Sequence, residues 1–216
     1  MIRHPSPNQG PRRDGLQPAL VVLHYTEMVS AEAALDRLCD PAAQVSSHYL
    51  IGRDGRVWQL VDEDQRAWHA GAGEWLGASD VNSRSIGIEL DNDGKSPFSA
   101  PLMNALEPLL AGILTRWAIP PAGVIAHSDM APGRKIDPGP RFDWRRLGRQ
   151  GLALWPATMG DPQAPLNASL DALGYPEVPP ALRLAAFRLR FRPGQTGPED
   201  AIDRARAEAA ARLSRA

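Results

Sequence analysis

Runs of apolar residues alternate with helical patterns along the first two thirds of the chain. Three runs have the β-branched, uninterrupted apolar character of buried strands: residues 19–26 (ALVVLHYT), 83–90 (SRSIGIEL) and 123–128 (GVIAHS). A helix is predicted to begin at Ser30 and to end at Pro41, and a second has helical spacing over residues 101–117. Proline removes a backbone donor, so Pro108 should kink or break the second helix.

Residues 45–61 (VSSHYLIGRDGRVWQLV) have the pattern of a β-hairpin. Two strand-like halves flank Gly52-Arg53-Asp54-Gly55, and the Asp-Gly pair is typical of a tight hairpin turn. Strands that alternate with helices favour a parallel sheet, whereas a hairpin adds an antiparallel pair. The predicted fold is therefore α/β, with a mixed central β-sheet flanked by helices.

The two ends of the chain differ from this region in composition and in sequence pattern. Residues 1–18 are rich in proline and arginine and are expected to be irregular, and residues 157–165 (ATMGDPQAP) have the composition of a linker. Three helical patterns follow: residues 166–175, 179–191 and 198–213, the last with Pro198 in its first turn. We predict a catalytic domain over residues 1–156 and a small all-helical module over residues 163–216.

Composition narrows the possible functions. The 216 residues are 43% apolar and 23% charged, as in ordinary globular proteins, and the formal net charge is −1. Without a basic tract, nucleic-acid binding has no electrostatic support, and no apolar run reaches the roughly 20 residues of a membrane span. One cysteine, Cys39, excludes an internal disulfide and is expected to be buried and inert. The N-terminus shows no export signal, which predicts a cytoplasmic location, or a periplasmic one if a leader was removed.

Residues 126–140 (AHSDMAPGRKIDPGP) carry the most informative polar residues. His127, Lys135 and Asp137 fall within eleven positions, interleaved with prolines and glycines that exclude a regular helix or central strand. A stiff loop that presents an imidazole, an ammonium and a carboxylate indicates a chemical site.

His24 and Glu89 lie in two of the predicted strands and complete a candidate zinc site. A catalytic zinc takes three ligands from His, Asp, Glu or Cys and leaves a position for water, and His24, His127 and Asp137 form such a set. Glu89 interrupts an apolar strand, where partial burial would lift its pKa towards that of a general base. Lys135 could donate to the oxyanion formed when an amide is attacked. Each residue alone is more often structural than catalytic, so the set carries the prediction.

These segments resemble the zinc-dependent N-acetylmuramoyl-L-alanine amidases, a family that includes phage amidases and peptidoglycan recognition proteins. The resemblance covers about residues 20–155 and rests on five segments in family order: LVVLHYT, VSSHYLIGRDGRVWQLV, RAWHAGAG, NSRSIGIEL and AHSDMAPGRKIDPGPRFDW. It implies that His24, His127 and Asp137 bind Zn²⁺, that Glu89 activates water and that Lys135 stabilises the tetrahedral intermediate.

The resemblance also implies a branch and a substrate. Ser47 replaces the tyrosine of phage and animal members, and Asp137 stands where those members usually have cysteine, as in the bacterial AmpD/AmiD branch. The implied substrates are peptidoglycan fragments (muropeptides), including 1,6-anhydro forms, cut between N-acetylmuramic acid and L-alanine during wall turnover or recycling. The last sixty residues loosely resemble a peptidoglycan-binding module, which could bind wall polymer or only buttress the catalytic domain.

Four further residues are candidates for substrate binding: Trp68, Arg134, Asn82 and Gln44. Trp68 could offer an apolar face to the sugar or peptide, and Arg134 could pair with substrate carboxylates. His69 and His48 are expected to support the site rather than to bind metal.

Two alternatives remain open at this stage. The chain could be a peptidoglycan recognition module without activity, or a zinc hydrolase for another acylated amino acid or peptide. No protein partner is predicted, and the pattern leaves open the preference between anhydro-muropeptides and intact wall, the stem-peptide length and the oligomeric state.

Overall fold

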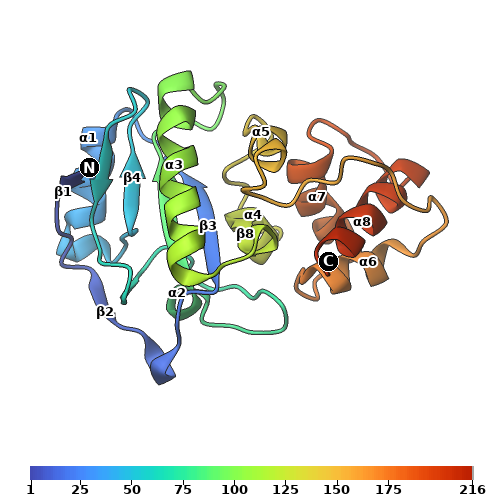
Figure 1. Ribbon diagram of the computed structural model, residues 1–216, viewed down its shortest axis with the longest axis horizontal. Helices are drawn as coiled ribbons and strands as arrows, with labels where there is room; N and C mark the ends of the chain where they lie inside the picture. Colours follow the sequence, from blue (N-terminus) through green and yellow to red (C-terminus); the bar gives the residue numbers. More distant parts are fainter. Residues whose placement is uncertain (216) are drawn as a thin grey trace.

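A six-stranded sheet forms the centre of the fold. The computed structural model describes residues 1–215, and Figure 1 shows the sheet with helices packed on it. In spatial order its strands are β1 (Ile2–Arg3), β5 (Val57–Gln59), β4 (Tyr49–Ile51), β7 (Ser85–Leu90), β3 (Leu20–Tyr25) and β8 (Val124–Ala126). The hairpin pair β4–β5 is antiparallel and the other neighbouring pairs are parallel. The predicted mixed sheet is therefore confirmed.

The two faces of the sheet are covered by different helices. Side chains alternate along a strand, so Val21 and Leu23 of β3 face one way and Leu20 and Val22 the other. Val21 and Leu23 pack in a core with α3 (Ala100–Trp117), which Figure 1 shows lying along the sheet. Leu20 and Val22 belong to a second core, shared with the C-terminal helices. His24 continues the Leu20–Val22 face.

The remaining elements of the first 156 residues frame the sheet. Helix α1 (Ala31–Cys39) begins where predicted, because the Ser30 side chain accepts the N–H of Ala33, and it packs over β4 and β5. Strands β2 (Gln9–Pro11) and β6 (Gln65–Ala67) form a separate antiparallel ribbon. The other elements are short: α2 (Val81–Arg84), α4 (His127–Met130), α5 (Trp144–Arg149) and the 3₁₀ turns Arg13–Gly15, Pro41–Ala43 and Pro121–Gly123.

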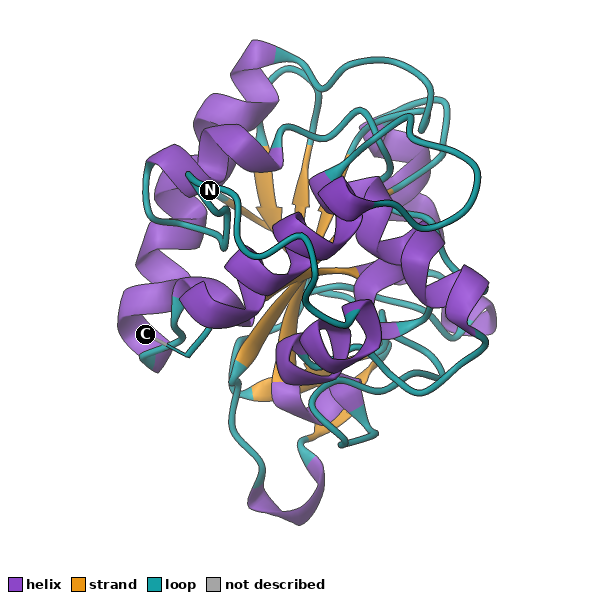
Figure 2. Ribbon diagram, turned by 90° about the vertical axis from the view of Figure 1, so that its right-hand side faces the viewer, coloured by secondary structure: helices purple, strands orange, loops and turns teal. Residues whose placement is uncertain are grey.

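Three C-terminal helices gather beside β8 and α4. They are α6 (Leu166–Leu173), α7 (Pro180–Phe191) and α8 (Ala201–Leu213), drawn in orange and red in Figure 1 and turned towards the viewer in Figure 2. Leu170, Phe187 and Ala207 from these helices share one buried core with Val22 and Ile125 of the sheet. The division into two domains stays a prediction. What the structure adds is that the helices complete the core on one face of the sheet.

Three local predictions were wrong, and a fourth, for Pro108, was wrong in part. Residues 1–18 are not wholly irregular, because β1 and β2 find partner strands far along the chain. Pro108 does not break α3, which runs through it with the ring on the exposed side, and the alternative of a kink stays a prediction. Helix α8 starts after Pro198, because Asp200 accepts the N–H groups of Ile202 and Asp203 and thereby caps it. His127 opens a single helical turn, α4, before the Pro/Gly-rich segment begins.

Among the described residues no helix combines the length and the apolar character needed to cross a bilayer.

Candidate metal centre and active site

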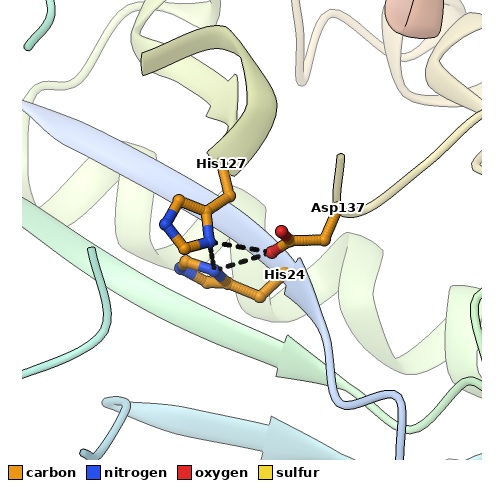
Figure 3. Close-up of side chains that lie close together, drawn as sticks. All are labelled: His24, His127 and Asp137. Carbon is orange, nitrogen blue, oxygen red and sulfur yellow. Dashed lines mark hydrogen bonds and ion pairs between the residues drawn. The ribbon is translucent and has the colours of Figure 1, made fainter. Parts of the chain in front are cut away.

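Three side chains from separate segments meet at the carboxyl end of the sheet. His24 lies near the end of β3, His127 follows β8 directly, and Asp137 comes from the loop after α4. His24 Nδ1 lies 3.0 Å from Asp137 Oδ2, and His127 Nδ1 lies 2.9 Å from the same oxygen and 2.9 Å from His24 Nδ1. Figure 3 shows the two rings and the carboxylate turned towards one point. All three side chains are buried.

A backbone carbonyl fixes the tautomer of His127. Its Nε2 lies 2.9 Å from the carbonyl oxygen of Ala70, which can only accept a hydrogen bond. Nε2 therefore carries the proton of the neutral ring, and Nδ1 presents a lone pair towards Asp137.

A longer chain of hydrogen bonds fixes the tautomer of His24. The Ser85 hydroxyl donates to Val81 O at 2.6 Å, so its oxygen is free to accept from His69 Nε2 at 3.2 Å. His69 Nδ1 is then unprotonated and accepts from His24 Nε2 at 3.0 Å. His24 Nδ1 is consequently left with a lone pair, as in His127.

The resulting arrangement fits a cation. Two imidazole lone pairs and a carboxylate oxygen that face each other repel unless a positive charge lies between them. In a tetrahedral zinc site with ligand bonds near 2.0 Å, the ligand atoms lie about 3.3 Å apart, close to the separations found here. Burial lowers the pKa of His24 to about 4 and keeps its ring neutral at pH 7. Burial alone would raise the pKa of Asp137, but the adjacent His127 and His24 lower it overall.

Glu89 lies beside His24 on the same face of the sheet. The two residues are register partners in the parallel pair β3–β7, so their side chains point the same way. Glu89 Oε2 is buried and has no hydrogen-bond partner among the described residues. Burial and the charge of Asp137 raise the pKa of Glu89 well above its usual value, and Lys135 opposes this. A carboxylate with a raised pKa and a free oxygen can take up a proton from a nearby water.

The absence of a side chain at Gly87 makes room for this arrangement. Gly87 is on the same face of β7 as Glu89, and a Cβ there would come within 2.4 Å of His69 Cγ. His69 can therefore lie flat enough against the strand to reach His24.

A cavity of about 590 Å³ opens over the three ligand candidates. Glu89, Lys135 and Trp68 line it together with residues of α1. A second cavity of about 540 Å³ shares Trp68 and Lys135 with the first and also has Gln44 on its wall. The predicted catalytic pair therefore borders the first cavity together with Trp68 and Arg134, and all four predicted substrate contacts border the second.

Asn82 and Arg134 have structural tasks as well as positions on the cavity walls. Asn82 Oδ1 accepts the N–H groups of His69 and Ala70 at 3.0 and 2.8 Å. The Arg134 guanidinium donates to the carbonyls of Ala70, at 2.7 Å, and of Ala72. Both side chains therefore hold the segment that contains His69 and Ala70. The carbonyl of Ala70 is the group that accepts the hydrogen bond from His127 Nε2. Their contacts with substrate stay predictions.

Sequence reasoning missed Ser85 and Gly87. Both belong to the segment NSRSIGIEL that pointed to Glu89, but neither has a chemical group that suggests a role by itself. Their function depends on His69, sixteen residues away from Ser85, lying against β7. Only the folded arrangement reveals that contact.

Comparison with known proteins gives the class of the enzyme. The model of the Amidase_2 family, described as N-acetylmuramoyl-L-alanine amidase, matches residues 14–140, which include all five predicted catalytic and ligand residues. The chain belongs to this family of amidases.

Individual relatives agree in sequence and in fold. The chain is 38% identical to N-acetylmuramoyl-L-alanine amidase AmiD of Escherichia coli, over 88% of this chain and 81% of the relative. It is 35% identical to 1,6-anhydro-N-acetylmuramyl-L-alanine amidase AmpD of Citrobacter freundii, over 67% of this chain and 87% of the relative. The structure of E. coli AmiD with anhydro-N-acetylmuramic acid-L-Ala-D-gamma-Glu-L-Lys superposes with a TM-score of 0.80 at 37% identity, covering 94% of this chain and 90% of that one. AmpDh3 of Pseudomonas aeruginosa gives a TM-score of 0.82 at 30% identity, covering 94% and 95%.

Ser85→Ala tests the hydrogen-bond chain behind His24. Without the hydroxyl, His69 loses the acceptor that fixes its tautomer, and zinc affinity should fall about 10-fold, the usual effect of losing a partner behind a ligand. Competition with a chromophoric chelator measures the affinity. Ser128→Ala is the matched control, since the buried Ser128 Oγ has no partner within residues 1–215 and should affect zinc little. Equal zinc affinities in the wild type and in Ser85→Ala would show that this hydrogen-bond chain does not position His24.

The buried His48 is expected to make the free energy of unfolding depend on pH. Its Nδ1 accepts the N–H of Gly87 at 2.9 Å, and its Nε2 lies 3.1 Å from the carbonyl of Gln65. Burial and the charge of Arg12 lower the pKa of His48 to about 3 in the folded state. Since the unfolded ring has a pKa near 6.5, the stabilisation is complete above about pH 6.5 and is lost as the pH falls towards 3.

The check compares the wild type with His48→Gln, whose amide can make both hydrogen bonds without titrating. Measured by urea unfolding, the wild-type advantage in free energy should shrink by about 2 kcal/mol between pH 7.5 and pH 5.0. Parallel pH profiles for the two proteins would show that His48 does not carry this dependence.

Proposed function

We propose that this chain is a zinc-dependent amidase that cleaves the amide bond between N-acetylmuramic acid and the L-alanine of peptidoglycan stem peptides. The observation that carries the proposal is the convergence of His24, His127 and Asp137 beside a half-buried carboxylate, Glu89, in one cavity. Membership of the amidase family supports the same bond specificity.

The ligand set suits zinc. Two neutral imidazoles and one carboxylate form a common catalytic zinc set, and they leave a position open towards the cavity. A zinc ion bound there would lower the pKa of a water molecule to roughly 7 and polarise the amide carbonyl.

Glu89 and Lys135 supply the proton transfers and the charge stabilisation. Glu89 takes a proton from the attacking water, and the water oxygen bonds to the amide carbon. The Lys135 ammonium donates a hydrogen bond to the oxygen that gains negative charge in this step. Glu89 then returns the proton to the nitrogen of L-alanine as the C–N bond breaks, which releases a free amine and a lactyl carboxylic acid that ionises in water.

We propose muropeptides with 1,6-anhydro-muramic acid among the substrates. E. coli AmiD and AmpDh3 of P. aeruginosa, both similar to this chain, are known in complexes with anhydromuramyl peptides. Trp68 offers an apolar face at the junction of the two cavities, and Lys135 and Arg134 place positive charge on the same walls. These features suit a sugar joined to a peptide that carries carboxylates.

Product analysis tests the activity and excludes a recognition module without catalysis. The purified chain with one equivalent of zinc is incubated with anhydro-N-acetylmuramic acid-L-Ala-D-γ-Glu-L-Lys. Mass spectrometry should detect free tripeptide and free anhydro-sugar, whose masses sum to that of the substrate plus one water. If the zinc-loaded protein binds the probe but releases no tripeptide, the chain is a binding module and the proposal fails. Simple acyl-amino acids, tested in parallel, should be cleaved far more slowly.

Glu89→Gln and His127→Ala separate the two roles. Glu89→Gln keeps the shape of the side chain but cannot accept the proton, so kcat should fall about 10²- to 10⁴-fold with one zinc still bound. His127→Ala should lose zinc itself, because it removes a ligand. Metal analysis and steady-state kinetics measure both effects. Glu27→Gln, at an exposed position of the same cavity, is the matched control and should change kcat less than about 3-fold. Loss of zinc from Glu89→Gln would show that Glu89 acts as a ligand rather than as a base.

A further inference from the structure

A buried carboxylate lies directly behind the metal-ligand candidate on α4. Asp129 is two residues after His127 and is fully buried. Its Oδ2 accepts the N–H of Ala126 at 2.9 Å, which closes the helical turn that carries His127. The backbone on both sides of His127 is therefore held by one side chain.

Two residues of the C-terminal helices hold this carboxylate. The Tyr175 hydroxyl, just after α6, donates to Asp129 Oδ1 at 2.6 Å. Arg190, on α7, donates to Asp129 Oδ2 at 3.2 Å and also to the carbonyl of Val124 at 3.0 Å. Val124 begins β8, the strand that leads into His127. Arg190 thus contacts the chain both before and after this ligand candidate.

These contacts are buried and costly to break. Arg190 and Tyr175 are only 4% and 5% exposed, and the Arg190 guanidinium also donates to Leu154 O and stacks 4.1 Å above the Trp144 ring. A buried carboxylate is strongly destabilising unless its oxygens are paired, so Asp129 depends on both partners. Burial and Asp129 raise the pKa of Tyr175 well above its usual value, so the hydroxyl keeps the proton that it donates.

Helix α7 also lies against the loop that leads to Asp137. A Cβ added at Gly133 would come within 2.8 Å of Leu182 Cδ1, so the helix and the loop are in close contact. The same helix therefore borders the segments that present two of the three ligand candidates.

We propose that Tyr175 and Arg190 are positioning residues for the metal centre: through Asp129 they hold the turn that aims His127 at the ion. In this chain the C-terminal helices would then serve the metal site itself, in addition to any contact with wall polymer. The inference rests on the proposed metal site at His24, His127 and Asp137. Groups behind a ligand usually change metal affinity 10- to 100-fold when they are removed.

The alternative is that these contacts only fasten the C-terminal helices to the sheet. In that case, removing one of these contacts lowers the free energy of unfolding but leaves the zinc affinity of the folded protein unchanged. Zinc affinity and stability against unfolding must therefore be measured on the same variants.

The experiment compares Tyr175→Phe and Arg190→Lys with Arg188→Lys in the full chain. Tyr175→Phe removes one hydroxyl and keeps the ring, and Arg190→Lys keeps the charge but cannot reach Asp129, Val124 and Leu154 together. Arg188 is the matched control, because it makes an equally buried ion pair with Asp203 between α7 and α8, at 2.5 Å, away from His127. Zinc affinity is measured at 25 °C by chelator competition, and thermal unfolding is measured on the metal-free proteins.

We expect Tyr175→Phe and Arg190→Lys to bind zinc at least 10-fold more weakly than the wild type, whereas Arg188→Lys unfolds at a lower temperature with wild-type zinc affinity. If the first two variants bind zinc within 2-fold of the wild type, or if Arg188→Lys weakens zinc as much as they do, the inference is overturned while the proposed function stands. A wild-type chain that binds no zinc would overturn the metal site and this inference together.

Discussion

The structure depends on one electrostatic constraint, the meeting of two imidazole lone pairs and a carboxylate oxygen in a buried space. Each Nδ1 is left unprotonated because its ring donates through Nε2, in His127 to the carbonyl of Ala70 and in His24 to His69. Three acceptor atoms about 3 Å apart are unfavourable without a cation between them, since burial weakens the screening of their repulsion. The fold holds these groups in place through partners on every side, which is what a preorganised metal site requires.

The sheet explains how residues far apart in sequence reach this point. His24 and Glu89 are register partners on neighbouring parallel strands, so the carboxylate and the imidazole emerge from the same face and the same end. Gly87 leaves the space on that face for the His69 ring. The C-terminal helices cover the adjoining part of this face and reach α4 through Asp129, so the core and the metal site share their support.

Much of this arrangement could be predicted from the sequence, and the rest could not for physical reasons. The strands around His24 and Glu89 are continuous apolar runs with a polar residue near the end. Such a pattern predicts both the strand and the position of its polar residue. The pairing of β1 with β5 is non-local, and residues 1–18 have too weak a pattern to reveal it. The start of α8 was misplaced because proline at a first turn and aspartate at a cap both signal a helix start, and here the Asp200 cap decides it. Nothing in the sequence links Asp129, although it lies within residues 126–140, to Tyr175 and Arg190, because these contacts span 46 and 61 residues of sequence.

The most direct test is the location of the ion in a crystal of the full chain grown with zinc. Anomalous diffraction recorded on both sides of the zinc absorption edge identifies the metal and its position. The account predicts a single strong peak about 2.0 Å from His24 Nδ1, His127 Nδ1 and Asp137 Oδ2, with the fourth direction open towards Glu89. A peak ligated by His69 in place of His24, or the absence of any peak among these three residues at full zinc loading, would contradict it.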